Sequence, residues 1–216
     1  MLIEIVSDVV CPWCYIGRRR LQRALALRPG LSYRLLWRVF QLNPEMPSQG
    51  IDRQAYLAAK FGGVQHAGRV YDAIAKAGES EGIAFRFDRI RRTPNSLNAH
   101  RLSRFAARSG QQNAMIDALF QAYFEEGEDI GRIDVLGDIA AAIGLERSAA
   151  VEFLIGSSER EAVLAEDRNA RRLGINGVPC FIIDGKYALS GAQDPEFFLP
   201  LFDLGRQEQS SSAAAE

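Results

Sequence analysis

The sequence has few cysteines, few histidines and no excess of charge of either sign. Its 216 residues include three cysteines and two histidines, and 26 basic residues are matched by 27 acidic ones. Cysteines at positions 11, 14 and 180 are too few and too unevenly spaced for the disulfide framework of an extracellular miniprotein. A net charge of -1 gives no field that would attract nucleic acid or an anionic membrane.

Long apolar runs are also absent. No segment approaches the ~20 apolar residues of a membrane span, and the N-terminal residues lack the pattern of a secretory signal. The apolar fraction of 47% is nevertheless sufficient for a folded core, which excludes a disordered chain. We therefore expect a cytoplasmic protein with reduced thiols and with no nucleic-acid or membrane partner.

Strand-forming residues gather at the two ends of the chain. Residues 2–6 and 31–42 predict strands that flank a helix beginning at Pro12, an order typical of a parallel sheet. Residues 178–190 predict a hairpin that turns at Asp184-Gly185. A last helix is predicted over about 194–204.

The middle of the chain has helical periodicity throughout. The predicted helices cover about 52–62, 64–78, 96–110, 112–126, 133–143, 147–155 and 158–172. We therefore predict an α/β protein, a thioredoxin-like fold with a large all-α inserted domain. Residues 1–43 and 174–207 would form the discontinuous thioredoxin-like domain, 44–173 the helical insertion and 208–216 a disordered tail.

Cys11-Pro12-Trp13-Cys14 lies where the first predicted strand passes into the first predicted helix. Residues three apart in a first helical turn have Cα atoms roughly 5–6 Å apart, a distance that a disulfide can bridge. Cys11 would face free backbone N–H groups and the positive end of the helix dipole, which stabilise a thiolate. Cys14, one turn deeper, is expected to be buried. The pattern predicts a redox pair in which Cys11 forms a mixed disulfide and Cys14 resolves it.

Two other interpretations of this pair stay open. It could be half of a zinc site, but the remaining soft ligands are Cys180, His66 and His100, with no second C-x-x-C, so we expect no metal. It could also be two thiols that only fill space.

Val178-Pro179 begins the predicted C-terminal hairpin. An X-Pro bond adopts the cis form at modest cost, and in a thioredoxin-like arrangement this turn would lie beside the two cysteines. The backbone of Val178 could then pair with a substrate strand. The alternative is an ordinary trans proline at the start of a strand.

Five parts of the sequence carry a recognisable pattern: Asp8–Gly17, Trp37–Pro44, Pro94–Ser96 with Ala99–Leu102, Gly177–Pro179 and Ser190–Gln193. Together they resemble one known family, the FrnE-type branch of the DsbA-like oxidoreductases. The resemblance implies a thioredoxin fold with an inserted helical domain, a redox-active Cys11-Cys14 pair and a cis Pro179. The same superfamily is similar to kappa-class glutathione transferases and 2-hydroxychromene-2-carboxylate isomerases, which use glutathione and typically carry a serine where Cys11 stands.

Two residues depart from the family pattern. Val39 stands where the family usually has proline, which we interpret as a packing change. Cys180 stands where an aromatic residue is more usual. Because side chains alternate along a strand, Cys180 is either a buried thiol or a third redox partner.

Four polar residues are further candidates. Asp8 is a proton acceptor or a cap of the loop before Cys11, and His100 faces the active-site groove or has a structural role. Asn95 and Arg101 could contact a glutathione carboxylate, although Asn95 could equally cap a helix. Trp13 offers an apolar rim to a substrate.

We therefore expect an enzyme, a thiol-disulfide oxidoreductase that acts on a disulfide- or thiol-bearing protein or small molecule. It would require no cofactor, with glutathione as a candidate co-substrate. One alternative is a glutathione-dependent isomerase or transferase on the same scaffold, and another is a chaperone-like client-binding module. The thiol pair could pass electrons in either direction, and a homodimer is a candidate assembly.

Overall fold

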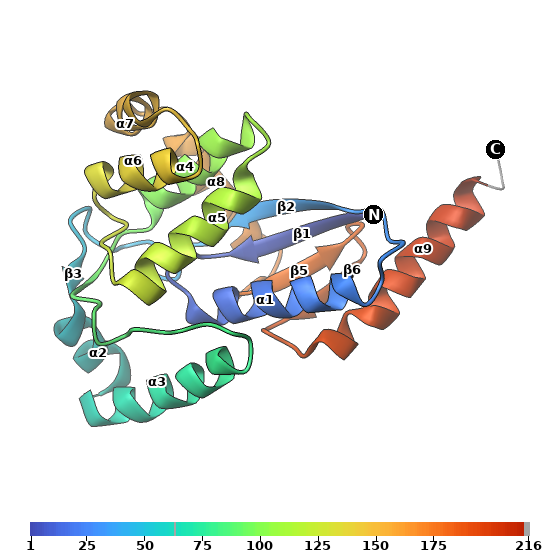
Figure 1. Cartoon of the computed structure of the whole chain (residues 1–216), viewed down its shortest axis with the longest axis horizontal. Helices are drawn as coiled ribbons and strands as arrows, with labels where there is room; N and C mark the ends of the chain where they lie inside the picture. Colours follow the sequence, from blue (N-terminus) through green and yellow to red (C-terminus); the bar gives the residue numbers. More distant parts are fainter. Residues whose placement is uncertain (63, 214–216) are drawn as a thin grey trace.

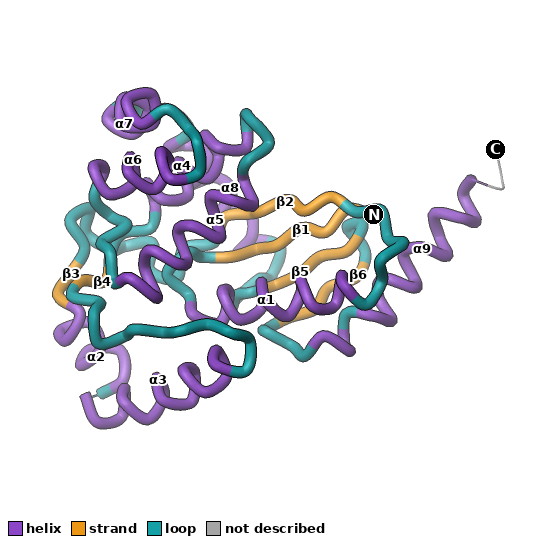
Figure 2. Tube along the Cα trace, viewed as in Figure 1, coloured by secondary structure: helices purple, strands orange, loops and turns teal. Residues whose placement is uncertain are grey.

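A four-stranded mixed sheet forms the centre of the computed structural model, which describes residues 1–62 and 64–213 (Figure 1). The strands are β1 (Leu2–Ser7), β2 (Arg34–Val39), β5 (Cys180–Ile183) and β6 (Tyr187–Ser190). Their order is β2-β1-β5-β6, with β1 parallel to β2 and antiparallel to β5. The predicted α/β fold is confirmed, with the parallel pair and the C-terminal hairpin side by side (Figure 2).

Helices account for most of the remaining chain. Helix α1 (Pro12–Ala26) joins β1 to β2, and α9 (Leu199–Ala213) ends the described chain after a short 3₁₀ turn at Pro195–Phe197. The helices between the two halves of the sheet are α2 (Arg53–Phe61), α3 (Val64–Glu79), α4 (Leu97–Ala107), α5 (Gln112–Gln121), α6 (Ile133–Ala142), α7 (Arg147–Ile155) and α8 (Arg160–Arg172).

Three elements differ from the predicted pattern. A small antiparallel sheet joins β3 (Ile51–Asp52) to β4 (Arg92–Thr93), and a π-helical turn at Ala122–Glu126 extends α5. Short strands and π turns depend on tertiary contacts, so their local sequences give little signal.

The two faces of the central sheet are covered by different helices. Ile5 and Phe181 belong to the main apolar core, which includes α1 and the start of α9. Their chain neighbours Val6 and Cys180 point to the other face and pack against Ala170 of α8. This division follows from the alternation of side chains along a strand.

The C-terminal segment corrects one expectation. Helix α9 continues to Ala213 instead of ending near residue 204, so residues 208–213 are helical where we expected a disordered tail. Glu208 accepts hydrogen bonds from Lys186 at 2.5 Å and Tyr187 at 2.8 Å, which hold this part of the helix against the β5–β6 turn. The rest of the predicted tail, residues 214–216, lies outside the described residues. In the part of the chain that the structure describes, no helix has the length and apolarity to cross a bilayer.

Candidate active site at the start of α1

Cys11 and Cys14 occupy the first turn of α1. Cys11 is the N-cap residue and has an extended backbone. Pro12 occupies the first helical position, where a backbone N–H would have no hydrogen-bond partner within the helix. The Cys14 N–H donates to the carbonyl of Cys11 at 3.0 Å. Both cysteines are free thiols, and their residues are only 4% and 1% exposed. The structure therefore presents a reduced dithiol at a helix N-terminus.

The sulfur of Cys14 is held in its protonated form. Burial raises the pKa of the Cys14 thiol well above its ordinary value, and the hydrogen bond and charge of Cys11 act in the same direction. The nearby Ser7 side chain and Asp8 backbone act in the opposite direction and partly lower the pKa of the Cys14 thiol. The raised pKa means that the Cys14 thiol keeps its proton at neutral pH.

The Val178–Pro179 turn lies against the cysteines. Its peptide bond is cis, and the thiol of Cys11 donates to the carbonyl oxygen of Val178 at 3.6 Å. Gly17 makes this approach of α1 feasible, because a Cβ built on it would lie 2.9 Å from Cγ of Pro179. Trp13, which lies between the two cysteines in the sequence, is 39% exposed. Its apolar ring therefore reaches the protein surface.

A carboxylate and an imidazole are buried behind the first turn of α1. Asp8 has no exposed surface, and its Oδ2 accepts from the N–H of Leu42 at 2.7 Å. Its Oδ1 lies 3.1 Å from Nε2 of His100, which reaches in from α4 and is 3% exposed. The structure thus brings together two predicted site residues that are 92 positions apart in the sequence.

This combination of fold and site agrees with one protein family. Residues 2–202 match the DSBA-like thioredoxin domain. The chain belongs to this family.

Two proteins are similar to this DSBA-like protein over most of its length. YwbO of Bacillus subtilis (strain 168) is 27% identical over 203 residues, which cover 91% of this chain and 92% of YwbO. The crystal structure of SCO1869 from Streptomyces coelicolor, described as a probable DsbA oxidoreductase, is 30% identical. Its TM-score is 0.86, and the match covers 96% of this chain and 91% of SCO1869.

Two less similar structures show the fold alone. A 2-hydroxychromene-2-carboxylate isomerase is 17% identical with a TM-score of 0.69, and each chain is covered completely. The cytosolic disulfide reductase DsbM from Pseudomonas aeruginosa, solved with GSH, is 22% identical with a TM-score of 0.64. That match covers 99% of this chain and 100% of DsbM.

Asn95 and Arg101 have structural roles in this DSBA-like protein. The Asn95 side chain accepts from the N–H of Leu97 at the start of α4 and donates to the carbonyl of Met46. Arg101 is buried, and its guanidinium donates to carbonyls that end α7 and begin the next loop, those of Phe153, Leu154, Gly156 and Ser158. Because its donors are already engaged, the structure does not support the predicted contact of Arg101 with a glutathione carboxylate.

Cys180 belongs to a different buried cluster from Cys11 and Cys14. Its side chain packs with Val6, Phe40 and Ala170, whereas Cys11 and Cys14 belong to the main core on the other face of the sheet. Burial also raises the pKa of the Cys180 thiol. These surroundings favour the buried-thiol interpretation over a third redox partner.

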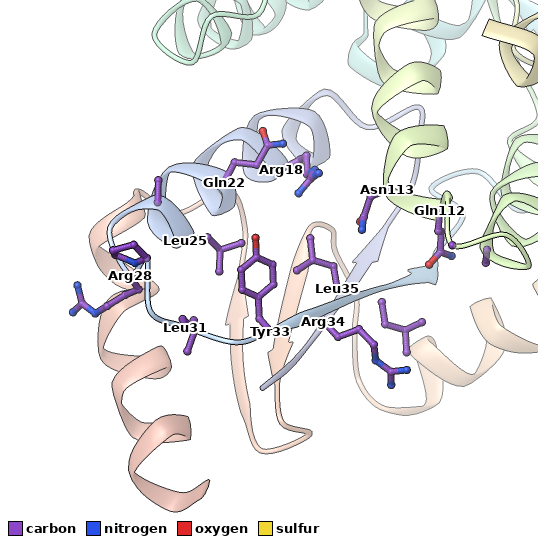
Figure 3. A pocket seen from close by; sticks show the side chains of 15 residues that line it. Arg18, Gln22, Leu25, Arg28, Leu31, Tyr33, Arg34, Leu35, Gln112 and Asn113 are labelled. Carbon is purple, nitrogen blue, oxygen red and sulfur yellow. The ribbon is translucent and has the colours of Figure 1, made fainter. Parts of the chain in front are cut away.

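Within residues 1–62 and 64–213, no group of three or more His, Cys, Asp or Glu side chains is arranged so that it could hold a metal ion. A cavity of about 850 Å³ does occur toward the far end of α1, between α1, β2 and α5 (Figure 3). Tyr33 and Leu35 point into it, with Leu25 on the α1 side. Neither Cys11 nor Cys14 lines this cavity.

Proposed function

We propose that this protein is a thiol-disulfide oxidoreductase in which Cys11 and Cys14 alternate between a dithiol and a disulfide. The observation that carries the proposal is the pair of free thiols in the first turn of α1, with the Cys11 sulfur against the Val178 carbonyl. The family match and the likeness to SCO1869 support the same chemistry.

The two cysteines divide the reaction between them. Cys11, at the positive end of the helix dipole, attacks a substrate disulfide as a thiolate; a Cys11–substrate bond forms and the first substrate thiolate leaves. Cys14 then loses its proton and attacks the Cys11 sulfur. The Cys11–Cys14 disulfide forms and the second substrate thiolate leaves, so the substrate is reduced and the enzyme is oxidised. The reverse sequence oxidises a dithiol substrate.

The surface around Cys11 suits an extended thiol- or disulfide-bearing substrate. Val178 is only partly buried, so its backbone can pair with a substrate strand, and the exposed ring of Trp13 offers an apolar contact. The cycle needs no bound cofactor, because the two thiols carry both electrons. We propose glutathione as the co-substrate that returns the disulfide to the dithiol in the cytoplasm; the DsbM structure, titled as cytosolic and solved with GSH, supports this assignment.

A Cys14→Ser variant tests this function. After incubation with glutathione disulfide, the wild type should contain the Cys11–Cys14 disulfide, whereas the variant should retain glutathione on Cys11, both measurable by intact mass. The variant should also lose turnover with a glutathionylated peptide. Cys180→Ser is the control and should behave as the wild type. Full turnover in Cys14→Ser would contradict the proposal and favour glutathione-dependent isomerase or transferase chemistry.

A further inference from the structure

The outer edge of β2 is open. This strand lies at the end of the four-stranded sheet, and β1 is its only partner among the described strands. Arg34 donates its N–H to the carbonyl of Met1, on the β1 side. Because the peptide groups of successive residues in a strand alternate in direction, those of Tyr33, Leu35 and Trp37 point away from β1. Unpaired groups on a sheet edge can receive a further strand.

The side chain of Gln112 already occupies this edge at Trp37. Its Oε1 accepts from the Trp37 N–H at 3.3 Å, and its Nε2 donates to the Trp37 carbonyl at 3.5 Å. The amide thus makes the two hydrogen bonds that a residue of a neighbouring strand would make. The outward N–H and C=O groups of Leu35 have no such partner within residues 1–62 and 64–213. The edge is therefore closed toward the end of β2 and open toward its start.

The open part of the edge lines the cavity of about 850 Å³ between α1, β2 and α5, which we call the β2 groove (Figure 3). Its volume lies within the range of known ligand sites. The side chains of Tyr33 and Leu35 point into the groove, and Leu25 and Leu31 add apolar surface to it. A segment that lay along the edge would therefore meet both free backbone groups and an apolar wall.

The charge of the β2 groove is positive. Arg18, Arg28 and Arg34 line it, and its described lining includes no Asp or Glu. Arg18 is paired with Asp117 at 2.9 Å. Arg28 is paired with Asp203 at 2.8 Å. Arg34 is exposed and forms no ion pair in the part of the chain that the structure describes, so it can pair with a carboxylate of a ligand.

The alternation of side chains determines which sequence would fit the edge. An added strand points its side chains alternately to the same two faces as β2. On one face they meet Tyr33 and Leu35, and on the other they meet Arg34. The edge therefore favours apolar side chains at every second position, with acidic side chains between them.

A second copy of the chain would match this edge less well. Its own β2 has the sequence Arg-Leu-Leu-Trp-Arg-Val, which contains no carboxylate. Two paired β2 strands would bring arginines together instead of opposite charges, and like charges on neighbouring strands are destabilising.

We infer that the outer edge of β2, at residues 33–35, binds an extended segment of a partner protein with alternating apolar and acidic residues, as a fifth strand of the sheet. The peptide groups of Leu35 exchange hydrogen bonds with the segment. Its apolar side chains enter the β2 groove, and a carboxylate pairs with Arg34. This binding does not involve the thiols, because neither Cys11 nor Cys14 lines the groove.

A fluorescein-labelled peptide, Glu-Leu-Glu-Leu-Glu, tests the inference by fluorescence anisotropy. The protein should bind it about tenfold more tightly than Lys-Leu-Lys-Leu-Lys. Arg34→Glu should weaken binding of the acidic peptide about tenfold and strengthen binding of the basic one. Arg91→Glu is the matched control, since Arg91 is also exposed but does not line the groove, and it should bind both peptides as the wild type does.

Two further measurements identify strand addition. Only every second N–H of an added strand faces its neighbour, so N-methylation of the peptide at its leucines and N-methylation at its glutamates should have different effects. One should abolish binding, and the other should leave it unchanged. Hydrogen exchange of the Leu35 N–H should slow in the complex, whereas that of the Arg34 N–H, which is already bonded to Met1, should not change.

The outcomes separate the possible occupants of the edge. No binding, or binding that does not depend on the charge of the peptide and of Arg34, would overturn the inference. Equal effects of the two methylations would also overturn it, because they would indicate a groove for side chains or a small amphipathic acid. A dimer in sedimentation, with Leu35 protected in the absence of peptide, would assign the edge to a second copy instead. The Cys14→Ser variant should bind the peptide as the wild type does, so failure of the proposed disulfide cycle would leave this inference standing.

Discussion

Cys14 makes the stability of the reduced protein depend on pH. In the unfolded chain its thiol ionises near pH 8.5, whereas burial raises the pKa of the folded thiol well above that value. Between these two values the folded state binds more protons than the unfolded state. Its contribution is therefore fully present below about pH 8.5 and is lost as the pH rises.

We predict that the free energy of unfolding of the reduced protein falls by up to about 1.4 kcal/mol per pH unit above pH 8.5 because of Cys14. Urea denaturation under a reducing agent measures this slope. Cys14→Ala should have a shallower slope, while Cys180, whose pKa is also raised, contributes equally to both proteins. Equal slopes in the wild type and in Cys14→Ala would show that burial does not raise the pKa of the Cys14 thiol.

Local spacing explains why the position of the two cysteines at a helix start could be predicted, whereas the residues that surround them could not. Cys11, Pro12 and Cys14 lie within one helical turn, so the strand-to-helix boundary and the sequence were sufficient. The contact between Asp8 and His100 joins residues 92 positions apart, and no local pattern encodes it. The carbonyl partners of Arg101 could not be predicted for the same reason, because they lie more than 50 positions away in the sequence.

At the scale of elements, Gly17 determines how closely α1 approaches the Val178–Pro179 turn. A Cβ on Gly17 would lie 2.9 Å from Pro179 and 3.1 Å from the ring of Phe181. Both neighbours are buried, so neither can move away freely. Helix propensity favours alanine over glycine by about 1 kcal/mol, whereas overpacking costs about 1–3 kcal/mol. The clash should therefore outweigh the gain in propensity.

Gly17→Ala should lower the free energy of unfolding by about 1 kcal/mol and slow the reaction of Cys11 with the aromatic disulfide DTNB, since Pro179 and Cys11 would be displaced. Gly68→Ala is the matched control, because Gly68 is an exposed helical position in α3 with no atom within 4 Å of the added Cβ. It should raise stability by about 1 kcal/mol. Stabilisation by both substitutions would mean that α1 does not need this close approach.

The helices were predicted more accurately than their surroundings. Asp52 and Gly62 at the ends of α2 mark its bounds through capping, which is a local interaction. The serine-rich end of α9 was misinterpreted as disordered because composition does not reveal the Lys186 and Tyr187 contacts with Glu208. Sequence patterns thus predicted the bounds of a helix whose ends are capped by nearby residues. They did not predict the bounds of a helix that contacts with distant residues extend.

For the whole molecule, one apolar core joins the sheet to the inserted helices. Ile3 and Phe181 of the sheet belong to the same buried cluster as Phe120 of α5 and Leu136 of α6. The rings of Tyr15 and Phe120 stack 5.0 Å apart across the predicted domain boundary. The sequence predicted a helical insertion over residues 44–173, but not that the apolar faces of these helices complete the core around α1.

A shared core predicts a single unfolding transition. Trp13 and Trp37 both lie in the thioredoxin-like part, so tryptophan fluorescence reports on that part, whereas far-ultraviolet circular dichroism reports mainly on the inserted helices. The two signals should give the same midpoint in urea. Phe120→Ala, which removes a fully buried ring on α5, should shift both midpoints together and cost about 3–5 kcal/mol. If only the dichroism midpoint moved, the insertion would be an independent domain, and the redox helix would not depend on it for its packing.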